Sequence, residues 1–111
     1  MIFITGPLYS GKKTYIREAL HMTQETFSKC AVWDVQDLAG QEDPEILAEK
    51  LSRNEIVIAT ETGCGIVPAE AKERKRREDA GRLACALAAR ADVVIRVCCG
   101  LPQVLKGNWP L

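Results

Sequence analysis

One short segment near the start of the chain combines residue types and a spacing that bind phosphate. Residues 6–14 read GPLYSGKKT, which contains the spacing G-x-x-x-x-G-K of a phosphate-binding loop. Gly6 would let the chain turn sharply, and Gly11 would admit a tight backbone whose N–H groups converge on an anion. Lys12 would add a positive charge at the start of a helix. The residues expected to bind a nucleotide here are Gly6, Tyr9, Ser10, Gly11, Lys12, Lys13 and Thr14.

The position after Lys12 departs from the usual form of such a loop. A hydroxyl there would reach Mg²⁺, but the residue is Lys13, and Thr14 follows it. Because one residue rotates about 100° around a helix, Thr14 points in a different direction from the missing hydroxyl. Lys13 either contacts phosphate or is a solvated helix residue. We keep Thr14 as the candidate hydroxyl ligand of the metal.

Two carboxylates follow other apolar runs. Asp34 ends the second run, and Glu61 comes directly after the third. In open α/β sheets, ligands bind at the carboxyl ends of the strands, so both side chains are expected near the loop. Asp34 either helps to hold Mg²⁺ or caps a loop, and both readings stay open. The candidate catalytic residues are Lys12, Asp34 and Glu61, and the candidate metal ligands are Thr14 and Asp34.

Apolar runs alternate with helical patterns along the chain. Four short runs rich in β-branched residues predict strands, at residues 2–5, 31–33, 56–59 and 93–95. Three stretches with helical periodicity or start signals predict helices, at residues 12–22, 43–53 and 68–90. Such alternation implies right-handed βαβ crossovers. We expect one α/β domain over residues 1–111, a three-layer P-loop NTPase-like fold with a mainly parallel sheet flanked by helices.

The composition excludes several classes of protein. The 111 residues include 15 basic and 15 acidic side chains, which argues against a basic protein that coats nucleic acid. No apolar run approaches the ~20 residues that span a membrane. The five cysteines are odd in number and form no C-x-x-C pair, so neither a disulfide framework nor a zinc site is expected. These features favour a cytoplasmic protein.

Motifs in the second half of the chain follow one another in a distinctive order. Residues 59–68 read ATETGCGIVP, residues 79–82 read DAGR, and residues 89–94 read ARADVV before a Gly-Leu-Pro turn at 100–102. Together with the opening loop, they resemble the bifunctional adenosylcobinamide kinase/adenosylcobinamide-phosphate guanylyltransferase family of cobalamin biosynthesis. The resemblance covers residues 1–20 and 55–106.

The resemblance implies a nucleotide-binding protein that acts with ATP or GTP and Mg²⁺. Its reaction would be phosphoryl transfer to a corrinoid hydroxyl, with adenosylcobinamide as the partner substrate. It also implies a homo-oligomer, and it makes Arg77 and Arg82 candidates for contacts to phosphate or to a neighbouring subunit.

One departure from the family keeps an alternative open. Family members are longer, and between the first helix and the E-x-G-x-G-I-V-P strand they carry the histidine that accepts GMP. Here that interval is short, and the single histidine, His21, ends the first predicted helix. The alternative is a non-catalytic or regulatory nucleotide-binding relative that has lost the guanylyltransferase activity, with or without the kinase activity.

Some further residues are interpreted as packing groups. The buried face of the helix at 43–53 is expected to hold Ile46, Leu47 and Leu51. Trp33 and Trp109 are interpreted as packing residues in preference to platforms for a base. Gly81 in mid-helix predicts that a strand or another protomer packs close to the backbone.

Overall fold

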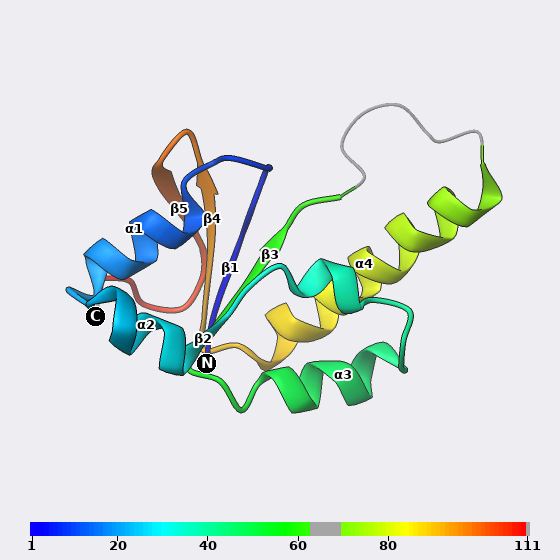
Figure 1. The fold of residues 1–111 in the computed structure, drawn as a ribbon, viewed down its shortest axis with the longest axis horizontal. Helices are drawn as coiled ribbons and strands as arrows, with labels where there is room; N and C mark the ends of the chain where they lie inside the picture. Colours follow the sequence, from blue (N-terminus) through cyan, green and yellow to red (C-terminus); the bar gives the residue numbers. More distant parts are fainter. Residues whose placement is uncertain (63–69, 111) are drawn as a thin grey trace.

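The computed structural model describes residues 1–62 and 70–110, and strands and helices alternate along them. The strands are β1 (Ile2–Gly6), β2 (Ala31–Val32), β3 (Ile56–Thr60), β4 (Val93–Cys98) and β5 (Leu101–Lys106). The helices are α1 (Lys12–Ala19), α2 (Gln24–Cys30), α3 (Pro44–Leu51) and α4 (Ala71–Arg90), with a short 3₁₀ helix, η1, at Val35–Leu38. Figure 1 shows these elements around the sheet.

The strands of the described residues form one sheet in the order β2-β3-β1-β4-β5 (Figure 1). The first four in this order are parallel, and β5 runs antiparallel to β4. β1 lies at the centre, so Gly6 at its carboxyl end is level with Thr60 of β3. The predicted α/β fold with a mainly parallel sheet is confirmed.

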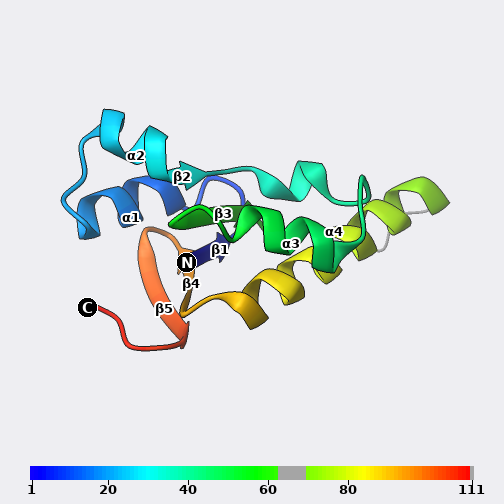
Figure 2. The ribbon, with the colours of Figure 1, turned by 90° about the horizontal axis from the view of Figure 1, so that it is seen from below.

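Successive residues of the central strands face two separate cores. Phe3 of β1 packs with the apolar side chains of α3 and α4, whereas its neighbour Ile4 packs with those of α1 and α2. Figure 2 shows α1 and α2 apart from α3 and α4, with the sheet between the two pairs. Because both faces of the sheet are covered, its inner strands read as continuous apolar runs, which is why the sequence predicts them well.

The predicted helix at 12–22 is confirmed over residues 12–19 and extends three residues too far. α1 ends at Ala19, and His21 has a positive φ of 54°, which interrupts the helix. Thr23 then begins α2, because its hydroxyl accepts a hydrogen bond from the Thr26 N–H at 3.1 Å. Neither α2 nor η1 is among the helices predicted from the sequence.

No strand is predicted after residues 93–95, but Leu101–Lys106 form β5. Cys99 and Gly100 have positive φ values of 54° and 74° and make a tight turn between β4 and β5. β5 is an edge strand of the described sheet, and all six of its residues are exposed. No core selects an alternating apolar pattern in such a strand, so the sequence carries little signal for it.

Two packing expectations on the helices need correction, one at Ile46 and one alternative at Gly81. Ile46 is 50% exposed, whereas Leu47 and Leu51 are buried as predicted and share the buried face of α3 with Ala48. A Cβ built at Gly81 meets no described heavy atom within 4 Å, so no strand of the described chain packs there, and the alternative of another protomer at this position stays a prediction. The predicted start of the long helix at Pro68 lies outside the described residues, within which α4 begins at Ala71.

Within residues 1–62 and 70–110, no helix has the length and apolar character needed to cross a membrane.

The correction on α3 gives a direct stability test. Leu47→Ala should lower the free energy of unfolding by about 2–5 kcal/mol, because it empties a buried site. Ile46→Ala, one residue away on the exposed side, should change it by no more than about 0.5–1 kcal/mol. Urea denaturation of both variants measures the difference, and equal losses would contradict the orientation of α3.

Candidate functional site

The segment between β1 and α1 bends sharply and is held against β4 and β5. A Cβ built at Gly6 would lie 2.1 Å from the Val97 carbonyl oxygen, so only glycine allows this approach. On the other side of the bend, the Gly100 N–H donates to the Ser10 carbonyl oxygen at 2.8 Å. Gly11, with a φ of 87°, forms the N-cap of α1. The loop is therefore fixed at both ends by neighbouring strands.

The first turn of α1 presents backbone donors that no described residue accepts. The first helical hydrogen bond of α1 runs from the Tyr15 N–H to the Gly11 carbonyl oxygen at 2.9 Å. The N–H groups of Lys12, Lys13 and Thr14 precede it and have no partner within the helix. Gly11 has no side chain that could cap them, and no side-chain cap is present. Three convergent N–H groups and the positive end of the helix dipole suit an anion.

Ser10 adds a buried polar atom inside the bend. The residue is 6% exposed, and its Oγ has no hydrogen-bond partner among the described residues. A Cβ built at Gly6 would lie 2.9 Å from this oxygen, so the hydroxyl faces the inside of the loop. A buried hydroxyl without a hydrogen-bond partner destabilises the folded protein, and a ligand that forms a hydrogen bond with it would remove this cost.

Lys12 lies across the mouth of the loop. The residue is 8% exposed, and its ammonium donates to the Pro7 carbonyl oxygen at 2.7 Å. Burial lowers the pKa of Lys12 below that of an exposed lysine, Asp34 and Glu61 oppose this shift, and Lys13 adds to it. A phosphate at the loop would give the ammonium a better partner than a neutral carbonyl.

A cavity of about 300 Å³ opens in front of the loop. Its lining brings together six of the seven predicted nucleotide-binding residues: Tyr9, Ser10, Gly11, Lys12, Lys13 and Thr14. Gly6, the seventh, shapes the bend from behind. Asp34 lines the same cavity from the end of β2, and its side chain makes no capping hydrogen bond to the described part of η1. Asp34 and Thr14, the predicted metal ligands, therefore face one space.

A model for the family described as cobinamide kinase/cobinamide phosphate guanyltransferase matches residues 22–105. The chain belongs to this family. Family membership and the phosphate-loop geometry are independent observations, because the matched range begins after the loop. The family has a P-loop fold and acts in cobalamin biosynthesis, in agreement with the fold and the resemblance above. No curated protein matches the chain.

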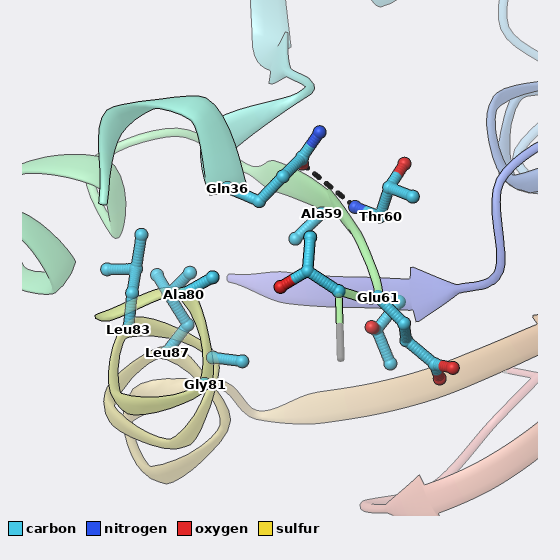
Figure 3. Close-up of a pocket in the computed structure, with 11 residues that line it drawn as sticks. Gln36, Ala59, Thr60, Glu61, Ala80, Gly81, Leu83 and Leu87 are labelled. Carbon is cyan, nitrogen blue, oxygen red and sulfur yellow. Dashed lines mark hydrogen bonds between the residues drawn. The ribbon is translucent and has the colours of Figure 1, made fainter. Parts of the chain in front are cut away.

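Glu61 belongs to a second, smaller cavity of about 190 Å³ on the other side of Thr60. In Figure 3, side chains of α4 such as Leu83 and Leu87 form one wall, and Gln36 of η1 approaches from above. The Thr60 N–H donates to Gln36 Oε1 at 2.9 Å, which fixes the end of β3 between the two cavities.

The carboxylate of Glu61 is held by a residue that the sequence analysis missed. Arg96 of β4 donates to both carboxylate oxygens of Glu61, with Nε–Oε1 and Nη2–Oε2 distances of 2.6 and 3.0 Å. Both side chains are partly buried, at 35% and 19% exposure for Arg96 and Glu61. A bidentate pair of this kind fixes the direction of the carboxylate. A lone arginine inside the apolar run VVIRVC was the available signal.

The remaining residues singled out for this family lie away from the loop. Arg82 forms an ion pair with Glu78 on α4, and Arg77 is half-buried; neither lines the two cavities at the carboxyl edge of the sheet. A contact of either arginine with a neighbouring subunit stays a prediction. His21 is exposed and lines neither cavity. The described residues hold no group of three His, Cys, Asp or Glu side chains that could bind a metal ion by itself.

The role of Gly6 can be tested against a matched glycine. Gly6→Ala places a methyl group against the Val97 carbonyl in addition to the strain of a positive φ, whereas Gly100→Ala, at a φ of 74°, has open space around the new Cβ. Gly100→Ala should cost about 1–3 kcal/mol of unfolding free energy, and Gly6→Ala should cost clearly more. Chemical denaturation measures both, and equal costs would contradict the close packing at Gly6.

The Glu61–Arg96 pair can be tested with a double-mutant cycle. Glu61→Gln, Arg96→Leu and the double variant should show a coupling of about 0.5–3 kcal/mol in unfolding free energy, because the two side chains contact each other directly. The same cycle on the exposed pair Lys29–Glu25 should give about 0.5 kcal/mol or less. A coupling near zero for Glu61 and Arg96 would mean that Arg96 does not fix the carboxylate.

Proposed function

We propose that this chain binds ATP or GTP at the loop between β1 and α1 and transfers the γ-phosphoryl group to a hydroxyl of adenosylcobinamide. The supporting observation is the anion cradle itself: the residues that carry the three uncapped N–H groups, the partnerless Ser10 Oγ and the Lys12 ammonium all line one cavity. Family membership supports the substrate class, since the matching family is described as cobinamide kinase/cobinamide phosphate guanyltransferase.

In the proposed complex the phosphates replace internal partners of the loop. The Lys12 ammonium leaves the Pro7 carbonyl and pairs with phosphate oxygens, and the N–H groups of the first turn of α1 donate to the same group. These donors are already in position, so they stabilise charge that builds up on the transferring phosphoryl group without reorganisation.

Asp34 and Thr14 supply one carboxylate and one hydroxyl to the loop cavity. This donor set fits Mg²⁺, which binds through one or two carboxylates together with substrate phosphates. The metal would neutralise charge on the phosphates when bound. Lys13 stands where the loop usually supplies a hydroxyl, so the metal would be held by Asp34 and Thr14 alone.

The acceptor hydroxyl is proposed to approach from the side of Glu61. The 190 Å³ cavity has room for one arm of a corrinoid, so the ring would stay outside. The hydroxyl oxygen attacks the γ-phosphorus, the bond from that phosphorus to the bridging oxygen breaks, and the nucleoside diphosphate leaves. Glu61, held in direction by Arg96, accepts a hydrogen bond from the hydroxyl and takes its proton. Guanylyl transfer is not proposed, because His21 lies away from both cavities.

A second candidate function, nucleotide binding without transfer, is favoured by two specific features. Lys13 replaces the usual metal-binding hydroxyl, and Arg96 neutralises the carboxylate that would act on the acceptor. Such a protein would be a regulatory relative of the kinases. Assembly into a homo-oligomer and a cytoplasmic location remain predictions for either function.

The two functions differ in a transfer assay. With γ-labelled ATP or GTP, Mg²⁺ and adenosylcobinamide, the wild-type protein should form labelled corrinoid, and Lys12→Ala should lower kcat/KM by about 10²–10³-fold. Lys29→Ala, which removes an exposed lysine on α2, should leave the rate unchanged. Nucleotide binding without labelled product would identify the regulatory alternative. Absence of nucleotide binding would contradict both functions.

The lowered pKa of Lys12 predicts a pH dependence. Burial favours the neutral amine, so the charge is lost at a lower pH than for an exposed lysine, and a bound phosphate raises the pKa again. Affinity for inorganic tripolyphosphate should therefore fall as alkaline pH passes the Lys12 pKa. The pKa of Lys12 is lower in the folded than in the unfolded chain, so the unfolded chain binds more protons in this range. The contribution of Lys12 to the free energy of unfolding therefore rises as the pH rises through the same range.

Calorimetric titrations with tripolyphosphate across alkaline pH measure this fall. In Lys12→Arg the guanidinium stays charged, so any remaining affinity should be flat over the same range. A wild-type affinity that is equally flat would show that Lys12 does not carry the charge that binds phosphate.

A further inference from the structure

A third hollow, of about 270 Å³, lies between α1 and α2 and adjoins the loop cavity. Lys13 and Thr14 line both spaces, so the first turn of α1 is the boundary between them. Beyond this boundary the residues that line the hollow include Arg17 of α1, Gln24 of α2 and Trp33. A ligand with phosphates at the loop could therefore extend into it without crossing the sheet.

Trp33 does not pack as the sequence analysis expected. Trp109 does: its indole N–H donates to the Tyr15 hydroxyl at 2.8 Å, and its ring packs against the core under α1. Trp33 belongs to neither core cluster and is 36% exposed. Its ring is nearly parallel to that of the buried Phe27, with an interplanar angle of 10° and centroids 5.9 Å apart. Trp33 is thus an oriented, solvent-accessible aromatic plane.

The ammonium group of Lys13 covers the ring of Trp33, and the phosphates of a bound nucleotide would attract it away from the ring. The Lys13 ammonium lies 4.4 Å from the centroid of the indole ring, and Lys13 itself is exposed. Such an exposed cation–π contact contributes about 0.5–1 kcal/mol. A charge-assisted hydrogen bond to phosphate is stronger. Phosphates bound at the N–H groups of Lys13 and its neighbours would therefore draw the ammonium off the ring.

We propose that Trp33 is the stacking platform for the purine base of the nucleotide whose phosphates bind the loop. Lys13 moves from the indole to the phosphates as the base takes its place, and Gln24 offers an amide to the edge of the base. This inference rests on the proposed function and extends the same site. It also accounts for the lysine at position 13, which serves as a phosphate contact in place of a metal-binding hydroxyl.

Two ligands separate base stacking from phosphate binding. ATP and GTP carry both groups, whereas inorganic tripolyphosphate carries only the phosphates. Trp33→Leu keeps an apolar side chain against Phe27 but removes the aromatic plane. It should weaken ATP and GTP binding by about 5- to 150-fold, the range for loss of one base–aromatic stack. Its affinity for tripolyphosphate should be equal to that of the wild type or up to about fivefold higher, because Lys13 no longer has to leave an indole ring. Retained tripolyphosphate binding also shows that the variant folds.

Two further variants act as controls, and all affinities are measured by calorimetry. Trp33→Phe retains an aromatic ring and should lose less affinity for ATP and GTP than Trp33→Leu. Trp109→Phe removes the other indole and should leave both affinities unchanged.

The stacking inference is overturned if Trp33→Leu binds ATP and GTP like the wild type, if it loses tripolyphosphate equally, or if the Leu and Phe variants lose the same affinity. If the wild-type protein binds neither tripolyphosphate nor nucleotide, the proposed function itself fails.

Discussion

The close approach of β1 to the Val97 carbonyl, which only a glycine at position 6 permits, is the contact on which the candidate site depends. It turns the chain off the centre of the sheet and brings Ser10 within a hydrogen bond of the β4–β5 turn. α1 then starts at Lys12 without a capping side chain, so its first N–H groups stay open. A Cβ at Gly6 would separate these elements and close the space in which an anion fits.

Two carboxylates reach this edge of the sheet in different electrostatic settings. Asp34 faces the loop cavity at the end of β2 without a capping bond to a described residue, whereas Glu61 is held by both nitrogens of Arg96. A carboxylate in the first setting can share a cation with phosphates, and one in the second can orient a neutral hydroxyl. Thr60 lies between the two cavities, so donor and acceptor would meet at the end of β3.

Much of the fold could be predicted because burial constrains sequence. The inner strands are covered on both faces and therefore appear as apolar runs, and the loop carries its own motif at residues 6–12. β5 left no such signal because its residues are exposed, and α2 depends on a local cap by Thr23, directly after the predicted helix at 12–22. The grouping of Asp34 with the loop followed from topology. The Arg96–Glu61 pair and the exposure of Trp33 depend on side-chain packing between distant elements, which one sequence does not reveal.

The most direct test of the anion cradle is a titration of the isotope-labelled protein with inorganic tripolyphosphate, followed through backbone amide resonances. If the loop binds phosphate, the amides of Gly11, Lys12, Lys13 and Thr14 should shift strongly and saturably, while those of α3 stay in place. Shifts spread weakly over exposed lysines, or no saturable change in the first turn of α1, would contradict the account.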